Sequence, residues 1–305
     1  MKAWIFPGQG AQYVGMGKDL YDHHITRGFM DRACEALGVD LISLMLEGPE
    51  EELTLTENAQ PAILLHSVAT AELLRISGQH PDVVAGFSLG EFSALVVARV
   101  ISFHDALKLV RLRGKAMQEA IAPGVGTMAA IMGLDATQIE YICKEVSPEG
   151  NVIVANYNAP GQVTISGLKD EVLLVLERAK AMGARRAVEL KVSAPFHTKF
   201  MVSAGEKLKE ALREIEIKPP KIPVISNVTA EPYPDDTVEI RELIARQASS
   251  PVLWEASIKR MIAMGTSYFL EVGPGKVLTG LNKRIERRVV TDYTDGRLNF
   301  TNVTV

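Results

Sequence analysis

Residues 86–90 read Gly-Phe-Ser-Leu-Gly, a Gly-x-Ser-x-Gly pattern that could present a nucleophilic serine. An unbroken apolar run at 83–87 predicts a strand buried on both faces, and a helical pattern starts at Gly90. A sharp turn from strand to helix exposes the serine hydroxyl, and the N-terminus of the following helix favours developing negative charge. We therefore expect Ser88 to be a nucleophile rather than part of a structural turn.

A serine hydroxyl needs a general base, and the chain has six histidines. Five have ordinary interpretations as solvent-exposed, packing or capping residues: His23, His24, His66, His80 and His104. His197 differs, because it follows a predicted strand at the junction between two predicted domains. Clefts form at such junctions, so we expect His197 to be the base.

An arginine interrupts the apolar side of the helix predicted over residues 103–121. At about 100° per residue, Arg113 lies between Leu109 and Ala116 on a stripe that should face the core. A buried guanidinium must find a carboxylate or an anionic ligand. Two readings remain open: a structural ion pair or snorkelling side chain, and a bidentate clamp for a substrate carboxylate or phosphate. A serine nucleophile beside such a clamp indicates an acyl group that carries its own acid.

The composition of the chain fits a globular protein and argues against several classes of partner and site. It has 305 residues, 47% of them hydrophobic and 23% charged, which suits one large or two modest globular domains. The net charge of −4 comes without a basic run, so we expect no nucleic-acid partner. Two distant cysteines argue against a disulfide scaffold and a zinc site, and we expect neither metal nor cofactor. No signal-peptide core or membrane-spanning stretch is visible, so we expect a soluble cytoplasmic protein.

Strand and helix patterns alternate along the chain, which predicts an α/β protein. We expect a large domain with a parallel sheet over residues 1–124 and 195–305. Residues 125–194 have the order βαββαβ, which predicts an inserted ferredoxin-like small domain. Its expected strands are 127–132, 152–156, 162–167 and 185–192, and its expected helices are 135–145 and 169–182.

Six motifs in this order resemble the malonyl-CoA:acyl carrier protein transacylases, a family that includes the acyltransferases of polyketide synthesis. They are residues 6–12 (FPGQGAQ), 86–95 (GFSLGEFSAL), 111–118 (RLRGKAMQ), 158–163 (NAPGQV), 194–197 (APFH) and 271–278 (EVGPGKVL). The resemblance extends over roughly residues 3–286. It implies an α/β-hydrolase-like large domain and a monomer.

The resemblance also implies roles for individual residues. Ser88 would carry the acyl group, His197 would be its base and Arg113 would hold the malonyl carboxylate. The backbone N–H groups of Gln9 and Leu89 would form the oxyanion hole. No aspartate completes a triad.

The resemblance implies further that a backbone carbonyl near Gln247 orients the imidazole, and that the Asn158 and Gln247 side chains line the pocket. The family usually has histidine before the nucleophile, where this chain has Phe87. Non-histidine residues at this position are associated with acyltransferases that serve polyketide synthases in trans. Phe196, immediately before His197, resembles the malonyl-selective form.

These features predict a ping-pong transfer of malonyl from coenzyme A, a substrate, to the phosphopantetheine thiol of an acyl carrier protein. One alternative is a hydrolase that releases acyl groups from carrier proteins with the same serine, and another is a docking domain without chemistry. Because the carrier is expected to be acidic, a local basic surface is needed. The candidates, which could also be ordinary solvated side chains, are Arg185, Arg186, Lys191 and Lys199.

Overall fold

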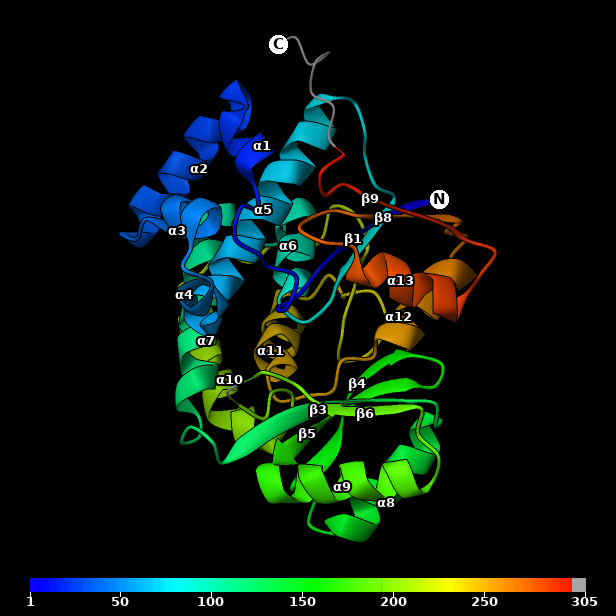
Figure 1. Cartoon of the computed structure of the whole chain (residues 1–305). Helices are drawn as coiled ribbons and strands as arrows, with labels where there is room; N and C mark the ends of the chain where they lie inside the picture. The colour runs from blue at the N-terminus through cyan, green and yellow to red at the C-terminus, as the bar shows by residue number, and fades with distance from the viewer. Residues whose placement is uncertain (193, 298–305) are drawn as a thin grey trace.

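A computed structural model of the chain, describing residues 1–192 and 194–297, has a parallel sheet in its larger part and an antiparallel sheet in its smaller part (Figure 1). The parallel sheet has the order β7-β2-β1-β8-β9. Its strands are β1 (Lys2–Phe6), β2 (Val83–Gly86), β7 (Val224–Ile225), β8 (Tyr268–Glu271) and β9 (Val290–Tyr293). The α/β prediction, with a parallel sheet in the large domain, is confirmed.

Alternate residues of the central strand β1 face two separate hydrophobic cores. Trp4 and Phe6 join the core formed with α5 (Thr56–Ile76), α6 (Gly90–Val97) and α7 (Phe103–Glu119). Ala3 and Ile5 join the core formed with α12 (Trp254–Ala263) and α13 (Val277–Ile285). Helices therefore cover both faces of the sheet, as the continuous apolar runs of β1 and β2 predict.

The remaining helices of the large part lie in two segments of the chain. Those in residues 18–54, where the sequence patterns assigned no element, are α1 (Lys18–Asp22), α2 (His24–Leu37), α3 (Leu41–Glu47) and α4 (Glu50–Thr54). Those after the small domain are the short 3₁₀ helix η1 (Lys199–Met201), α10 (Val202–Arg213) and α11 (Thr237–Gln247). Asp40 begins α3, where its side chain accepts a hydrogen bond from the backbone of Ser43.

The small part lies within the predicted range 125–194. Its antiparallel sheet has the order β4-β5-β3-β6. The strands are β3 (Gly126–Met132), β4 (Val152–Ala159), β5 (Gln162–Leu168) and β6 (Arg186–Glu189), and the helices are α8 (Ala136–Val146) and α9 (Lys169–Ala181). Both helices pack on one face of the sheet and lie below it in Figure 1. The other face is left free to line a cavity.

Strand β6 is shorter than the strand predicted over 185–192. It ends at Glu189, and the next residues turn back toward the large part, where Val192 donates to the carbonyl of Leu190. The alternating apolar pattern continues through this turn, because Leu190 and Val192 pack against the large core. Periodicity alone therefore extends the strand too far.

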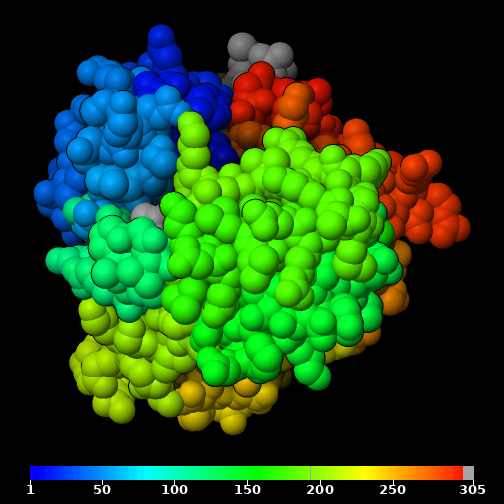
Figure 2. Space-filling model, turned by 60° about the horizontal axis from the view of Figure 1, so that its bottom comes forward, coloured from blue at the N-terminus to red at the C-terminus, as the bar shows by residue number. Residues whose placement is uncertain are grey.

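The entry and exit of the small part are in contact. A Cβ atom on Gly126 would lie 2.5 Å from the ring of Pro195, so only glycine fits there. Val252 of the large part also exchanges backbone hydrogen bonds with Ala155 and Tyr157 of β4. In Figure 2 the small part faces the viewer between the N-terminal helices and the C-terminal region. No helix among residues 1–192 and 194–297 is long and apolar enough to cross a membrane.

Candidate active site

Ser88 lies in the tight turn between β2 and α6, with a backbone φ of 51°. A Cβ atom on Gly86 would lie 1.8 Å from the backbone carbon of Gly90, so the turn can close only with glycine at position 86. Asn227 braces the turn from a distant segment: its Oδ1 accepts from the Ser88 N–H (2.7 Å) and its Nδ2 donates to the Gly86 carbonyl (2.6 Å). These bonds hold Ser88 in a conformation that L-residues rarely adopt.

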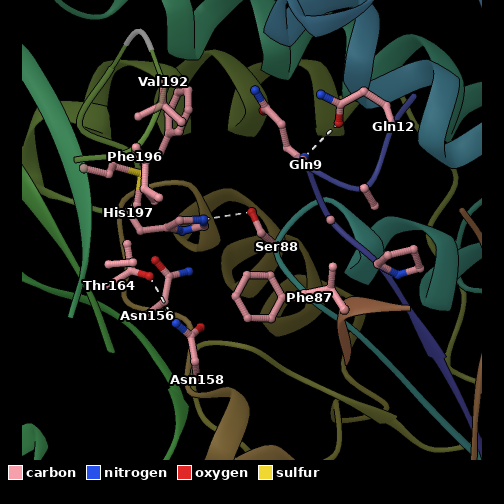
Figure 3. A pocket seen from close by; sticks show the side chains of 18 of the residues that line it. Gln9, Gln12, Phe87, Ser88, Asn156, Asn158, Thr164, Val192, Phe196 and His197 are labelled. Carbon is pink, nitrogen blue, oxygen red and sulfur yellow. Dashed lines mark hydrogen bonds between the residues drawn. The ribbon is translucent and has the colours of Figure 1, made fainter. Parts of the chain in front are cut away.

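His197 and Ser88 point toward each other across the cavity (Figure 3), with 2.8 Å between Nε2 and Oγ. The Nδ1 atom lies 3.1 Å from each of two backbone carbonyls, those of Gln247 and Ser250. Carbonyls only accept hydrogen bonds, so we assign the proton to Nδ1, which leaves Nε2 free to accept the serine proton. The arrangement positions a general base without a carboxylate.

The electrostatic environment keeps the imidazole of His197 neutral. Its burial, with the positive charge of Arg113 as the second cause, lowers its pKa to about 4. The two carbonyl contacts oppose this shift. A neutral imidazole at pH 7 can take a proton from Ser88, as a general base must.

Arg113 lies on α7 and is 1% exposed. Its guanidinium donates to neutral oxygens: the Oε1 of Gln60 (2.9 Å), the Oε1 of Gln247 (2.8 Å) and the Oγ of Ser88 (3.2 Å). Its Nε has no partner, and no ion pair joins it to an acid in the described part of the chain. Burial lowers its pKa to about 10, so it stays charged at neutral pH. A cation held only by neutral acceptors suits an anionic ligand.

The site opens into a cavity of about 440 Å³ between the two parts of the molecule. The large part contributes Ser88, Arg113, Gln9 and Phe87, together with Leu278 and Leu281 of α13. The free face of the small sheet contributes the opposite wall, which includes Met128, Ala130, Asn156, Asn158 and Thr164. Phe196 and His197 line it where the chain returns from the small part. The wall is apolar with a few polar groups, as in most small-molecule sites.

The predicted site residues come together, with one difference in position. Gln247 is 1% exposed and lies behind Arg113 and Ser88, rather than in the cavity wall, where the family resemblance placed its side chain. Phe87 packs edge-on against Trp254, with 5.6 Å between ring centroids. Asn158 lines the cavity and donates to Thr164 Oγ1 over 3.0 Å.

Two backbone N–H groups, one in the cavity wall and one next to Ser88 in the chain, have no hydrogen-bond acceptor among the described residues. The first belongs to Gln9 and the second to Leu89. The side chain of Gln9 is anchored on Thr56 over 3.2 Å. Paired donors of this kind act where negative charge develops on a carbonyl oxygen.

Sequence reasoning missed Asn227, and it also missed Gln60, which lies in an apolar helix. No local signal identifies Asn227, because its partners are far away in the chain. Glu91 could have been found in the way Arg113 was, as a charged residue on the buried face of a short apolar helix. Within residues 1–192 and 194–297, no cluster of three or more His, Cys, Asp or Glu could hold a metal ion.

Comparison with known proteins gives one consistent result. Residues 3–292 match the family described as acyl transferase domain. The chain is 49% identical over 291 residues to a malonyl CoA-acyl carrier protein transacylase of Bacillus subtilis, covering 95% of this chain and 92% of that protein. It is 46% identical over 286 residues to the protein of that name from Escherichia coli K12, with coverages of 93% and 92%.

Solved structures agree with these relatives. An acyl-carrier-protein S-malonyltransferase of Burkholderia pseudomallei has a TM-score of 0.93 at 43% identity, covering 96% of this chain and 95% of that one. A malonyl-transacylase solved in complex with a type II polyketide synthase acyl carrier protein has a TM-score of 0.93 at 42% identity, with 96% of each chain covered. The second structure contains both an enzyme and a carrier.

Proposed function

The chain belongs to the acyl transferase domain family, and on that basis we propose that it moves a malonyl group from coenzyme A to the phosphopantetheine thiol of an acyl carrier protein. The acyl group travels as an ester on Ser88, in the service of fatty acid or polyketide synthesis. Coenzyme A enters as part of a substrate, and the chemistry requires no resident cofactor.

In the first half-reaction, His197 takes the Ser88 proton on Nε2 while Oγ attacks the thioester carbonyl of malonyl-CoA. The resulting oxyanion accepts hydrogen bonds from the N–H groups of Gln9 and Leu89. Loss of one such donor typically lowers the rate by about 10²–10³. When the tetrahedral intermediate collapses, the carbon–sulfur bond breaks and the coenzyme A thiolate takes the proton from His197.

The second half-reaction reverses these steps with a different thiol. His197 takes the proton of the phosphopantetheine thiol, the sulfur attacks the Ser88 ester, and Ser88 Oγ leaves with the proton from the imidazole. A ping-pong order follows, because coenzyme A must leave before the carrier's thiol can enter the same cavity.

One observation carries the proposal for malonyl: the Arg113 guanidinium reaches Ser88 Oγ while holding only neutral oxygens. An acyl group esterified there would have its own carboxylate within reach of this cation. An acetyl group leaves the guanidinium without an anion, so the site should discriminate against it. A hydrolase that releases neutral acyl chains would gain nothing from a buried cation.

Intact-protein mass spectrometry tests the proposal directly. Wild-type protein mixed with malonyl-CoA should gain one malonyl group, which acetyl-CoA replaces poorly, and Ser88→Ala should gain none. Adding phosphopantetheinylated acyl carrier protein should remove the malonyl group faster than water does. Faster release to water would favour the hydrolase, and absence of any adduct would favour a docking domain without chemistry.

The carrier protein needs a surface around the cavity mouth. Lys191 lines the cavity, and Arg185, Arg186 and Lys199 are exposed on the small part and where the chain leaves it. We assign these four residues to the contact with an acidic carrier. We further propose that the protein acts as a cytoplasmic monomer without a membrane partner, which light scattering and cell fractionation would test.

A further inference from the structure

A buried acid lies one helical turn beyond the nucleophile and takes no part in the reaction described above. Glu91, on α6, is 1% exposed. Its Oε1 accepts from the backbone N–H of Asn227 (3.0 Å) and from the hydroxyl of Tyr233 (2.8 Å). Its Oε2 accepts from Nε2 of Gln247 (2.6 Å). No ion pair joins Glu91 to a basic side chain among the described residues. Burial raises the pKa of Glu91 to about 7, and these hydrogen bonds together with the positive charge of Arg113 oppose that shift.

The amide of Gln247 connects this acid to the arginine of the site. Besides the bond to Glu91, Nε2 donates to the Ser88 carbonyl over 2.7 Å, and Oε1 accepts from Nη2 of Arg113 over 2.8 Å. A carboxylate can only accept and a guanidinium can only donate. The amide therefore has one satisfactory orientation, with its nitrogen toward Glu91 and its oxygen toward Arg113.

We propose that Glu91 is a positioning residue for acyl selectivity: it fixes the Gln247 amide, and the amide holds the Arg113 guanidinium beside Ser88 Oγ. The inference rests on the proposed function, because it concerns the cation assigned to the malonyl carboxylate. Gln60 holds Nη1 of Arg113, but Nη2, the atom nearest Ser88, depends on Gln247. Without Glu91, the guanidinium keeps its charge and loses its fixed place.

The substitution Glu91→Gln tests the orientation argument with almost no change of shape. With Oε1 of the new amide kept on Asn227 and Tyr233, its Nε2 faces Nε2 of Gln247, and two donors meet. If the Gln247 amide turns over, its nitrogen faces Arg113 and the Ser88 carbonyl loses a donor. If the new amide turns over instead, its nitrogen meets the Asn227 N–H. Every arrangement thus leaves a donor against a donor.

We expect Glu91→Gln to lower kcat/KM for malonyl-CoA by about 100-fold, mainly through KM, because the clamp is misplaced. The acetyl-CoA reaction should change much less, so the malonyl-to-acetyl ratio should fall. Tyr233→Phe is the matched control: it removes one donor to Glu91 but keeps the carboxylate and its bond to Gln247, and should keep the wild-type ratio. An unchanged ratio in folded Glu91→Gln would overturn the proposal.

A double substitution separates positioning from a structural role. In an Arg113→Ala background, Glu91→Gln should leave the already low ratio as it is, because no clamp remains to be positioned. An equal further loss in both backgrounds would contradict the proposal. Should Glu91→Gln not fold, Glu91→Asp keeps the charge but draws the carboxylate away from Gln247, and an unchanged ratio there would equally overturn it.

The proposed function and this inference fail in different ways. Absence of malonylation in the wild-type protein would refute the function. Normal malonylation of the wild type with an unchanged ratio in the Glu91 variants would refute only the role of Glu91.

Discussion

The guanidinium of Arg113 donates from Nη2 to Oγ of Ser88 over 3.2 Å, although Ser88 lies in the turn before α6 and Arg113 lies on α7. The nucleophile thus has a general base on one side and a buried cation on the other. A guanidinium this close to the hydroxyl can hold the free carboxylate of an acyl group esterified at Ser88.

Replacing Arg113 with alanine should abolish the preference for malonyl while some acetyl loading remains. The malonyl-to-acetyl ratio of kcat/KM should fall by about 10⁴, because the buried cation no longer favours a carboxylate. Competition between the two acyl-CoA substrates, followed by mass spectrometry of the loaded protein, measures this ratio. A ratio equal to that of the wild type would refute the clamp.

The acid limb of the pH profile should lie well below the ordinary pKa of histidine. Burial and Arg113 lower the pKa of His197 to about 4, and only the neutral imidazole accepts the serine proton. Ser88 acylation by acetyl-CoA should therefore persist as the pH falls through 6.5, the ordinary histidine value, and be lost as it passes through about 4. The rate of Ser88 acylation, measured at a series of pH values across this range, tests the expectation.

Removal of the positive charge of Arg113 should shift the acid limb of the pH profile. In Arg113→Ala the imidazolium is no longer repelled, so the pKa of His197 should rise and the limb should shift to higher pH, with acetyl-CoA as the substrate. Arg113→Lys keeps the charge and should leave the limb near its wild-type position. Identical limbs in the alanine and lysine variants would contradict this electrostatic coupling.

Asn227→Ala should slow acylation with every acyl-CoA alike. The change leaves the Ser88 N–H and the Gly86 carbonyl without partners and releases the constrained turn, so kcat should fall by about 100-fold. Thr229→Ala, an exposed change in the same loop, is the control and should keep wild-type kinetics. A selective loss of the malonyl reaction alone would show that Asn227 serves the clamp instead of the turn.

Charge reversal at the basic surface should affect only the second half-reaction. With Arg185, Arg186, Lys191 and Lys199 changed to glutamate, malonyl loading from coenzyme A should stay within a few-fold of wild type, while transfer to the carrier should slow by about 10–100-fold at low salt. Added salt should slow transfer by the wild type and so reduce the difference in transfer rate between the wild type and the variant. Intact transfer in the variant, with salt still slowing it, would place the contact elsewhere.

The sequence predicted those parts of the site that depend on local patterns. The strand and helix around Ser88 determine the turn, and helical periodicity places Arg113 on the buried face of α7. Position at a domain junction was enough to select His197 among the histidines. The first two inferences use residues close together in the chain, whereas the third uses the predicted order of elements over residues 125–194.

The remaining parts depend on contacts between distant segments. The bond between Asn227 and Ser88 spans 139 positions, and that between Gln247 and Glu91 spans 156. No periodicity or spacing connects such pairs, so no sequence pattern predicts that the Gln247 amide lies behind Arg113. The shortened β6 has a similar cause, because the return of the chain to the large part ends the strand before its pattern ends.

The residues that position the catalytic groups are translated after the catalytic groups themselves. Ser88, Arg113 and His197 have all been translated before Asn227 and Gln247 are added, yet the last two hold the first three in place. A nascent polypeptide that ends before Asn227 therefore contains the reacting groups without the residues that position them. We expect such a chain to gain its activity only after the segment with Asn227 and Gln247 has emerged and docked.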